Sequence, residues 1–212
     1  MKKTTAIWAA ALAAFAAAGT LQAHHSGSMY QATPIWVSGT VVQFDGVNPH
    51  TLITLEERSA NGQVRRWRVE GPGQSQIERM GIGAYVPNIG DTVTFCAFPY
   101  KSVEELSRIF PDADFSASRA VLDPDSSSPR SVAGHVMITA DGEKRLWEPH
   151  GVIGECIRSS DEPRQSWVDF LNASPRAREA FCEQRGYALV QSNASLRDLV
   201  EEINGSIDNS CG

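Results

Sequence analysis

Basic side chains are scarce in this sequence. Its 212 residues include 19 lysines and arginines against 25 aspartates and glutamates, a formal charge of −6 at neutral pH. A protein that binds nucleic acid or an anionic membrane surface concentrates cations where they neutralise phosphates. The sequence contains no such basic stripe. We therefore expect no nucleic-acid partner.

Familiar catalytic motifs are also missing. The sequence has no Gly-x-Ser-x-Gly elbow, no His-Glu-x-x-His pair, no phosphate-binding glycine loop and no dinucleotide fingerprint. The acidic pairs Glu56–Glu57 and Glu104–Glu105 are interpreted as solvated surface, because adjacent side chains point apart in a strand or a helix. We therefore expect that the protein is not an enzyme.

Long apolar runs are absent except near the amino terminus. There, Lys2 and Lys3 precede an alanine-rich stretch, and Ala23 supplies the small residue that signal peptidase requires. The run is too short and too rich in alanine for a membrane anchor. We expect residues 1–23 to be a signal peptide and His24 to begin a periplasmic chain without a membrane span. Loss of the two lysines would change the formal charge from −6 to −8.

Cysteine is present at only four positions, Cys96, Cys156, Cys182 and Cys211. An even number of cysteines in an exported chain predicts disulfides, and the lack of Cys-x-x-Cys spacing argues against a zinc site. Four cysteines allow three pairings. Local geometry favours Cys182 with Cys211 and, by elimination, Cys96 with Cys156.

Residues 24–158 have the pattern of one small β-domain. Five segments are rich in β-branched and aromatic residues. Hairpin turn signals are Asn61–Gly62, between the second and third segments, and Asp141–Gly142, within the fifth. The predicted strands lie within residues 35–46, 50–58, 65–71, 88–98 and 134–149, with a short helix within 73–82. This order predicts a mainly β fold, namely a small, partly closed barrel of the oligonucleotide/oligosaccharide-binding (OB) type, with a β-sandwich as the alternative.

An irregular insertion, residues 101–133, interrupts the strand pattern. Residues 102–110 favour a short helix, whereas the prolines and serines of residues 123–130 are typical of a loop. We interpret the insertion chiefly as a mobile loop, although insertions of this length are often functional.

The carboxyl-terminal extension, residues 159–212, is predicted to be helical. Ser174 is a good amino-terminal cap, Pro175 suits the first helical position, and Gly186 is placed to end that helix. A second helix is expected from Ser195 to Gly205, with its apolar residues on one face.

Several short motifs resemble a known family. They are His24-His25-Ser26, Asn48-Pro49-His50, Trp67 and the flanking stretches VSGTVVQFDGVNPHTLITLE, IGDTVTF and ITADGEKRLW. Together they resemble DUF6152, a family of small exported bacterial proteins of unknown function. The resemblance covers about residues 24–147 and implies an exported β-domain. It implies no activity, and the insertion and the cysteine-bearing tail depart from the family pattern.

The histidines at the predicted mature terminus suggest a metal site. After cleavage at Ala23, His24 would offer its α-amine and its ring Nδ1 to one ion. His50, at the start of a strand, is the expected third ligand, and His25 is its substitute. Three nitrogens in this arrangement suit Cu(II). Cleavage one residue earlier would expose Ala23-His24-His25, which also binds Cu(II) or Ni(II).

A metal-free role is the alternative. His24 and His25 would then be solvated terminal residues, and the protein would contact a periplasmic protein or an envelope glycan through its barrel face or through residues 101–133. His135 and His150 are interpreted as structural. Trp36, Trp67 and Trp147 are expected in the core or at the barrel rim.

Overall fold

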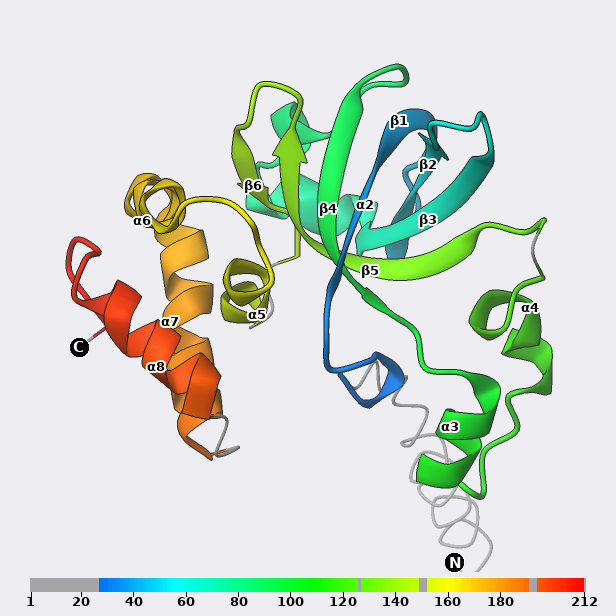
Figure 1. Cartoon of the computed structure of the whole chain (residues 1–212). Helices are drawn as coiled ribbons and strands as arrows, with labels where there is room; N and C mark the ends of the chain where they lie inside the picture. Colours follow the sequence, from blue (N-terminus) through cyan, green and yellow to red (C-terminus); the bar gives the residue numbers. More distant parts are fainter. Residues whose placement is uncertain (1–26, 126, 149–151, 191–193, 212) are drawn as a thin grey trace, which may run out of the picture.

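The computed structural model describes residues 27–125, 127–148, 152–190 and 194–211, and Figure 1 shows their arrangement. Six strands form one sheet: β1 (Ile35–Asp45), β2 (His50–Arg58), β3 (Val64–Pro72), β4 (Thr92–Pro99), β5 (Arg130–Thr139) and β6 (Lys144–Leu146). The α-helices are α2 (Gln74–Met80), α3 (Val103–Ile109), α4 (Arg119–Leu122), α5 (Ile153–Arg158), α6 (Arg164–Ala173), α7 (Pro175–Val190) and α8 (Ala194–Asn204). Three short 3₁₀ helices are η1 (Gly27–Met29), η2 (Gly83–Tyr85) and η3 (Ser116–Ser118).

The first five strands close into a barrel. Their order is β3-β2-β1-β4-β5, and a parallel pairing of β5 with β3 joins the two ends, while β6 adds to β5 as an extra strand. This connectivity, with α2 between the third and fourth strands, is that of the OB barrel. The predicted small barrel is therefore confirmed, and the fold is not the alternative sandwich.

The predicted hairpin turns form where glycine provides a left-handed backbone. Gly62 has a φ of 81° between β2 and β3, and Gly142 has a φ of 85° between β5 and β6. Each glycine N–H donates to the carbonyl three residues earlier, on Ser59 and Thr139 respectively. Local sequence thus sets the register of both hairpins.

The parallel contact that closes the barrel corrects the boundary of the insertion. Residues 130–133, expected to be irregular, form the start of β5 and pair with residues 67–70 of β3. The earlier part of the insertion contains the expected helix α3 and also α4. A capping box fixes the start of α3, because Ser102 and Glu105 each accept from the other's backbone N–H.

The interior of the barrel is apolar. Alternate residues of the strands point inward and are at most 7% exposed, as expected for strands with one buried face. Ile77 of α2 and Trp147, which follows β6, complete this cluster, whose members are Val37, Val41, Ile53, Leu55, Trp67, Val69, Ile77, Val93, Phe95, Ala97, Val132, Met137 and Trp147.

Four helices, α5 to α8, form a second cluster beside the barrel (Figure 1). Their buried residues include Trp167, Phe181 and Val200, and they pack together with Cys96 and Phe98 from the outer face of β4. The helical part therefore begins with α5, earlier than the predicted start at residue 159.

The boundaries of α7 are only partly as predicted. Ser174 caps the helix, since its Oγ accepts from the backbone N–H of Ala177 at 3.3 Å, and Pro175 is its first residue. The helix then continues through Gly186 to Val190, so the expected end at Gly186 is wrong. A single glycine costs a helix only about 1 kcal/mol, which is too little to end a helix by itself.

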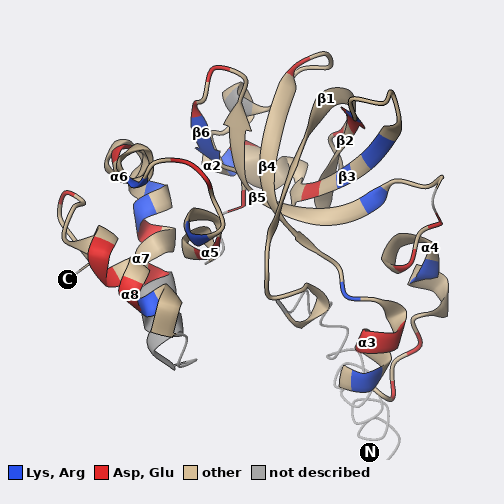
Figure 2. Cartoon of the chain, in the orientation of Figure 1, with Lys and Arg blue, Asp and Glu red and all other residues tan. Residues whose placement is uncertain are grey.

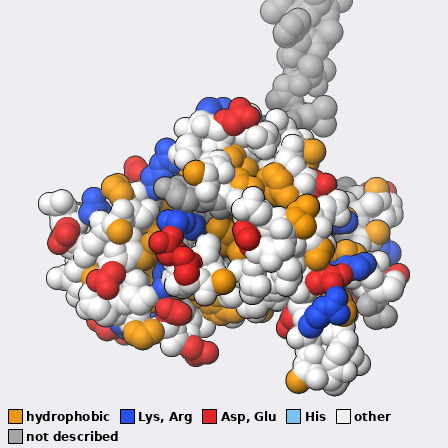
Figure 3. All heavy atoms as spheres, turned by 90° about the horizontal axis from the view of Figure 1, so that it is seen from above, with side chains coloured by type: hydrophobic (Ala, Val, Ile, Leu, Met, Phe, Trp, Pro, Cys, Tyr) orange, Lys and Arg blue, Asp and Glu red, His pale blue; other side chains and the backbone are white. Residues whose placement is uncertain are grey.

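Charged residues of both signs are spread along the barrel strands and the helices (Figure 2). A space-filling view from above shows acidic and basic side chains interspersed, with apolar side chains gathered towards the middle of that face (Figure 3). No helix among the described residues has both the length and the apolar character needed to cross a membrane.

Candidate metal site

His50 is the one predicted metal-site residue that the structure describes, and its position follows from the Asn48-Pro49-His50 motif. A cis peptide bond joins Asn48 to Pro49, and β2 begins at His50. The Asn48 side chain accepts from the backbone N–H (3.1 Å) and from the hydroxyl (3.0 Å) of Ser75 in α2. Asn48 thus ties the start of β2 to the first turn of α2.

A carboxylate on the neighbouring strand holds the His50 ring. The Nδ1 atom lies 2.9 Å from Oε1 of Glu70 and 3.3 Å from the carbonyl oxygen of Gly71. The antiparallel register pairs His50 with Pro72, which places Glu70 two residues away on the same face of β3. Both neighbours of Nδ1 are acceptors, so this nitrogen carries the proton, and the neutral ring would use Nε2 as its metal-binding atom.

The second oxygen of Glu70 belongs to a hydrogen-bonded chain of tyrosines. The Tyr100 hydroxyl donates to Oε2 of Glu70, and the Tyr30 hydroxyl donates to that of Tyr100 at 3.3 Å. The two tyrosine rings pack with their centroids 4.7 Å apart. Four side chains therefore form a continuous chain from His50 to Tyr30.

Burial keeps both tyrosines in their protonated, donating form. Burial, and next the Glu70 carboxylate, raise the pKa of Tyr30 from its ordinary 10.0 to about 12. The same two causes raise the pKa of Tyr100 further. At neutral pH both hydroxyls are therefore available as donors in the chain that ends at Glu70.

His24 and His25 lie outside the described residues. Among the residues that the structure does describe, no group of three or more His, Cys, Asp or Glu side chains could hold a metal ion. Among the described residues, His50 with its partner Glu70 could thus supply one ligand to a metal, and any further ligands would have to come from elsewhere. His135 packs its ring edge-to-face on Phe98, with centroids 5.0 Å apart, whereas His150 also lies outside the described residues.

Sequence reasoning identified His50 but missed Glu70, Tyr100 and Tyr30. The alternation of β3 was a usable signal for Glu70, because diagonal neighbours on one face of a hairpin, two residues from the direct partner, are within reach of long side chains. Tyr30 and Tyr100 are 70 positions apart and meet at an isolated β-bridge. No local pattern in the sequence indicates that contact.

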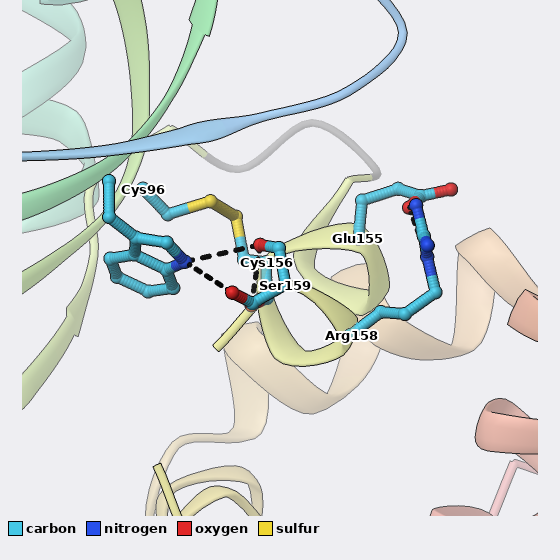
Figure 4. The surroundings of a disulfide bond; sticks show 6 residues. Cys96, Glu155, Cys156, Arg158 and Ser159 are labelled. Carbon is cyan, nitrogen blue, oxygen red and sulfur yellow. Dashed lines mark hydrogen bonds and ion pairs between the residues drawn. A yellow bond between two sulfur atoms is a disulfide. The ribbon is translucent and has the colours of Figure 1, made fainter. Parts of the chain in front are cut away.

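The favoured disulfide pairing is confirmed. Cys96 of β4 is bonded to Cys156 of α5, and Cys182 of α7 to Cys211 near the carboxyl terminus. Figure 4 shows the first bond crossing from the barrel to α5, where the Trp36 indole donates to the carbonyl and the hydroxyl of Ser159 at 3.1 Å each. The bond and the indole together attach the helices to the barrel.

The tryptophans offer little surface to a flat ligand. Trp67 and Trp147 are 7% and 1% exposed and belong to the barrel core, where Trp67 donates to Glu57 at 2.8 Å. Trp36 packs against the helical cluster. A separate cavity of about 360 Å³ lies between η2, the start of β4 and the β5–β6 turn, and no residue of the His50 chain lines it.

The comparisons with known proteins bear on family rather than on activity. No significant match was found among the curated proteins or among the solved structures. Residues 11–107 match the model of DUF6152, which is described as a family of unknown function. This range includes β1 to β4 and ends within α3. The resemblance seen in the sequence is thereby confirmed: residues 11–107 are similar to the DUF6152 family.

Proposed function

We propose that this protein is exported to the periplasm and that its mature form binds copper(II) through His24 and His50, with His50 rather than its substitute His25 as the third ligand. The α-amine and ring Nδ1 of His24 would supply two nitrogens, and Nε2 of His50 the third. Imidazole and amine nitrogens match the tetragonal preference of Cu(II).

The contact between His50 and Glu70 carries the proposal. Metal-ligating histidines usually donate their other ring N–H to a carboxylate, which orients the ring and makes it a better ligand. Nδ1 of His50 has this partner at 2.9 Å. The His50 side chain is 30% exposed and that of Glu70 14%, so the pair is accessible but partly shielded from water.

The path of the chain supports an approach of His24 to His50. Tyr30 belongs to the hydrogen-bonded chain that reaches His50, and only six positions separate it from His24. An extended chain of that length spans about 20 Å. This length supports the proposal that His24 can approach His50.

The disulfides and the leader sequence support export. All four cysteines are paired, as is usual for proteins of oxidising compartments and rare in reducing ones. Residues 1–23 have the pattern of a cleaved leader. The metal-free alternative, a module that contacts a protein or a glycan through its outer surface, requires none of the histidines.

The first test is the intact mass of the exported protein, followed by a Cu(II) competition titration of that material. A mass that begins at His24, with one tightly bound equivalent, is expected. His24→Ala, His50→Ala and an added residue before His24 should each abolish tight binding, whereas the control His150→Ala should not. Tight binding that survives His50→Ala, or no tight binding at all, would favour the metal-free module.

Amine labelling provides an independent test. Beyond residue 23 the sequence contains only two lysines, Lys101 and Lys144, so the mature chain has three amines in all. Copper should protect the α-amine of His24 from acylation near neutral pH and leave the labelling of Lys144 unchanged. Equal labelling of the α-amine with and without copper would exclude the terminal chelate.

A further inference from the structure

The segment that follows the predicted amino terminus is held against the end of β4. The Met29 carbonyl accepts from the Lys101 N–H at 2.9 Å, and the Gln31 N–H donates to the Pro99 carbonyl at 2.8 Å. Between these two bonds Tyr30 forms an isolated antiparallel bridge with Tyr100. Residues 29–31 thus continue the sheet for a short distance beyond β1.

The ammonium group of Lys101 reinforces this contact. Its Nζ donates to the carbonyl of Ser28 at 2.6 Å and also to the carbonyl of Tyr30. These two carbonyls flank Met29, so one ammonium group joins two carbonyls of the same short backbone segment. Hydrogen bonds from a charged donor are about twice as strong as neutral ones.

The insertion fixes the position of Lys101. Lys101 lies between the last residue of β4 and Ser102, the cap of α3. Val103 and Leu106 of α3 pack with Leu122, and Met29 and Tyr100 pack against this cluster. The amino-terminal segment therefore contacts the insertion through both a polar and an apolar interface.

We propose that Lys101 is a positioning residue, and that the insertion serves to fix residues 28–31 so that the amino terminus is delivered beside His50. The metal-binding part of this inference rests on the proposed copper site. A tethered chelate gains affinity when the segment that carries it is ordered before the metal arrives, because less conformational entropy is lost on binding.

The test compares three variants of the mature, disulfide-bonded protein. Lys101→Met keeps an apolar chain of similar length but removes both side-chain hydrogen bonds, and Lys101→Arg restores donors at the same place. Arg108→Met is the matched control. It removes a cation from α3 that forms an ion pair with Glu104, in which both side chains are more than two-thirds exposed.

The first measurement needs no metal. Hydrogen exchange of the Gln31 amide in the apo protein reports directly on the bond to Pro99. We expect faster exchange in Lys101→Met, and wild-type rates in Lys101→Arg and Arg108→Met. Unchanged exchange in Lys101→Met would overturn the anchoring role.

The second measurement is Cu(II) affinity together with the electron paramagnetic resonance spectrum. Lys101→Met should bind about 10- to 100-fold more weakly, with a spectrum showing fewer nitrogen ligands, and Lys101→Arg should recover both properties. Wild-type affinity and spectrum in Lys101→Met would overturn the positioning role. If the wild type binds no copper, the proposed function fails, and Gln31 exchange alone then decides whether Lys101 anchors the segment.

Discussion

Nδ1 of His50 lies 2.9 Å from a carboxylate oxygen of Glu70, a residue brought beside it by the pairing of β2 with β3. Glu70 in turn accepts from Tyr100, so its two oxygens serve different partners. The carboxylate therefore orients the histidine ring and also connects it to the segment that leads to the amino terminus.

Glu70→Gln should weaken copper binding while preserving the fold. The amide has the same shape and can still accept one hydrogen bond, but it lacks the charge that makes His50 a strong ligand. Loss of such a partner typically costs about 10- to 100-fold in metal affinity. A competition titration measures the change. Glu56→Gln is the control, because the ion pairs of Glu56 among the described residues are with Arg58 and Arg66. Equal affinities in the two variants would contradict the role of Glu70.

The two disulfides should differ in their resistance to reduction. Cys96 and Cys156 are both 0% exposed, whereas Cys182 and Cys211 are partly exposed. A reductant attacks an accessible sulfur first. Under native conditions, mass mapping after dithiothreitol and alkylation should find Cys182 and Cys211 modified before the other two. The reverse order would show that the helical extension protects its own bond better than the barrel does.

Loss of the Cys182–Cys211 disulfide should destabilise the helices more than the barrel. Cys182 and Cys211 enclose a sequence separation of 29 residues. Chain-entropy models assign such a loop about 3–4 kcal/mol of stability. Urea unfolding of the Cys182→Ser/Cys211→Ser double variant should show this loss, with copper affinity unchanged. A parallel loss of copper affinity would mean that the extension supports the His50 site.

Gly71→Ala should destabilise the barrel strongly. A Cβ at residue 71 would lie 2.0 Å from the indole nitrogen of Trp147, which is 1% exposed and has no room to move. Overpacking of this kind costs about 1–3 kcal/mol or more. Gly83→Ala is the control, since a Cβ there meets no atom within 4 Å. Thermal unfolding should separate the two variants by several degrees, and similar midpoints would argue against this packing.

The contact between Lys144 and Glu162 should make the stability of the protein depend on pH in the acid range. Its side chain is 4% exposed, lies 2.9 Å from Glu162 and packs over the Trp167 ring at 5.1 Å. The hydrogen bond from Lys144 holds the pKa of Glu162 below its usual 4.5. A depressed carboxyl pKa contributes stability above pH 4.5 that is lost as the pH falls through the folded-state value.

Lys144→Met removes the hydrogen bond to Glu162 and with it this pH dependence. We expect a loss of about 1–3 kcal/mol in the free energy of unfolding at neutral pH. The difference between variant and wild type should shrink below pH 4.5, because Glu162 becomes protonated in both. Urea unfolding at pH 7 and at pH 3.5 measures this, and a difference that grows at the lower pH would refute the assignment.

The barrel strands were predictable because their signals are local. Alternation of apolar residues identified β1 to β3, and Asn61–Gly62 and Asp141–Gly142 identified two hairpin turns by their need for a positive φ. The parallel pairing of residues 130–133 with β3 was not predictable, since it joins segments about 60 residues apart. A parallel strand carries no turn signal, and its residues follow a loop rich in serine and proline.

By itself, the sequence determined the chemistry that is available: two histidines at a predicted amino terminus, a third at a strand start, four cysteines and an acidic, mainly β chain. Only the tertiary structure decided that Glu70, Tyr100, Tyr30 and Lys101 gather between His50 and residues 28–31. The reason is that these residues are brought together by sheet pairing between distant segments, and the energy of such contacts depends on closure of the whole barrel.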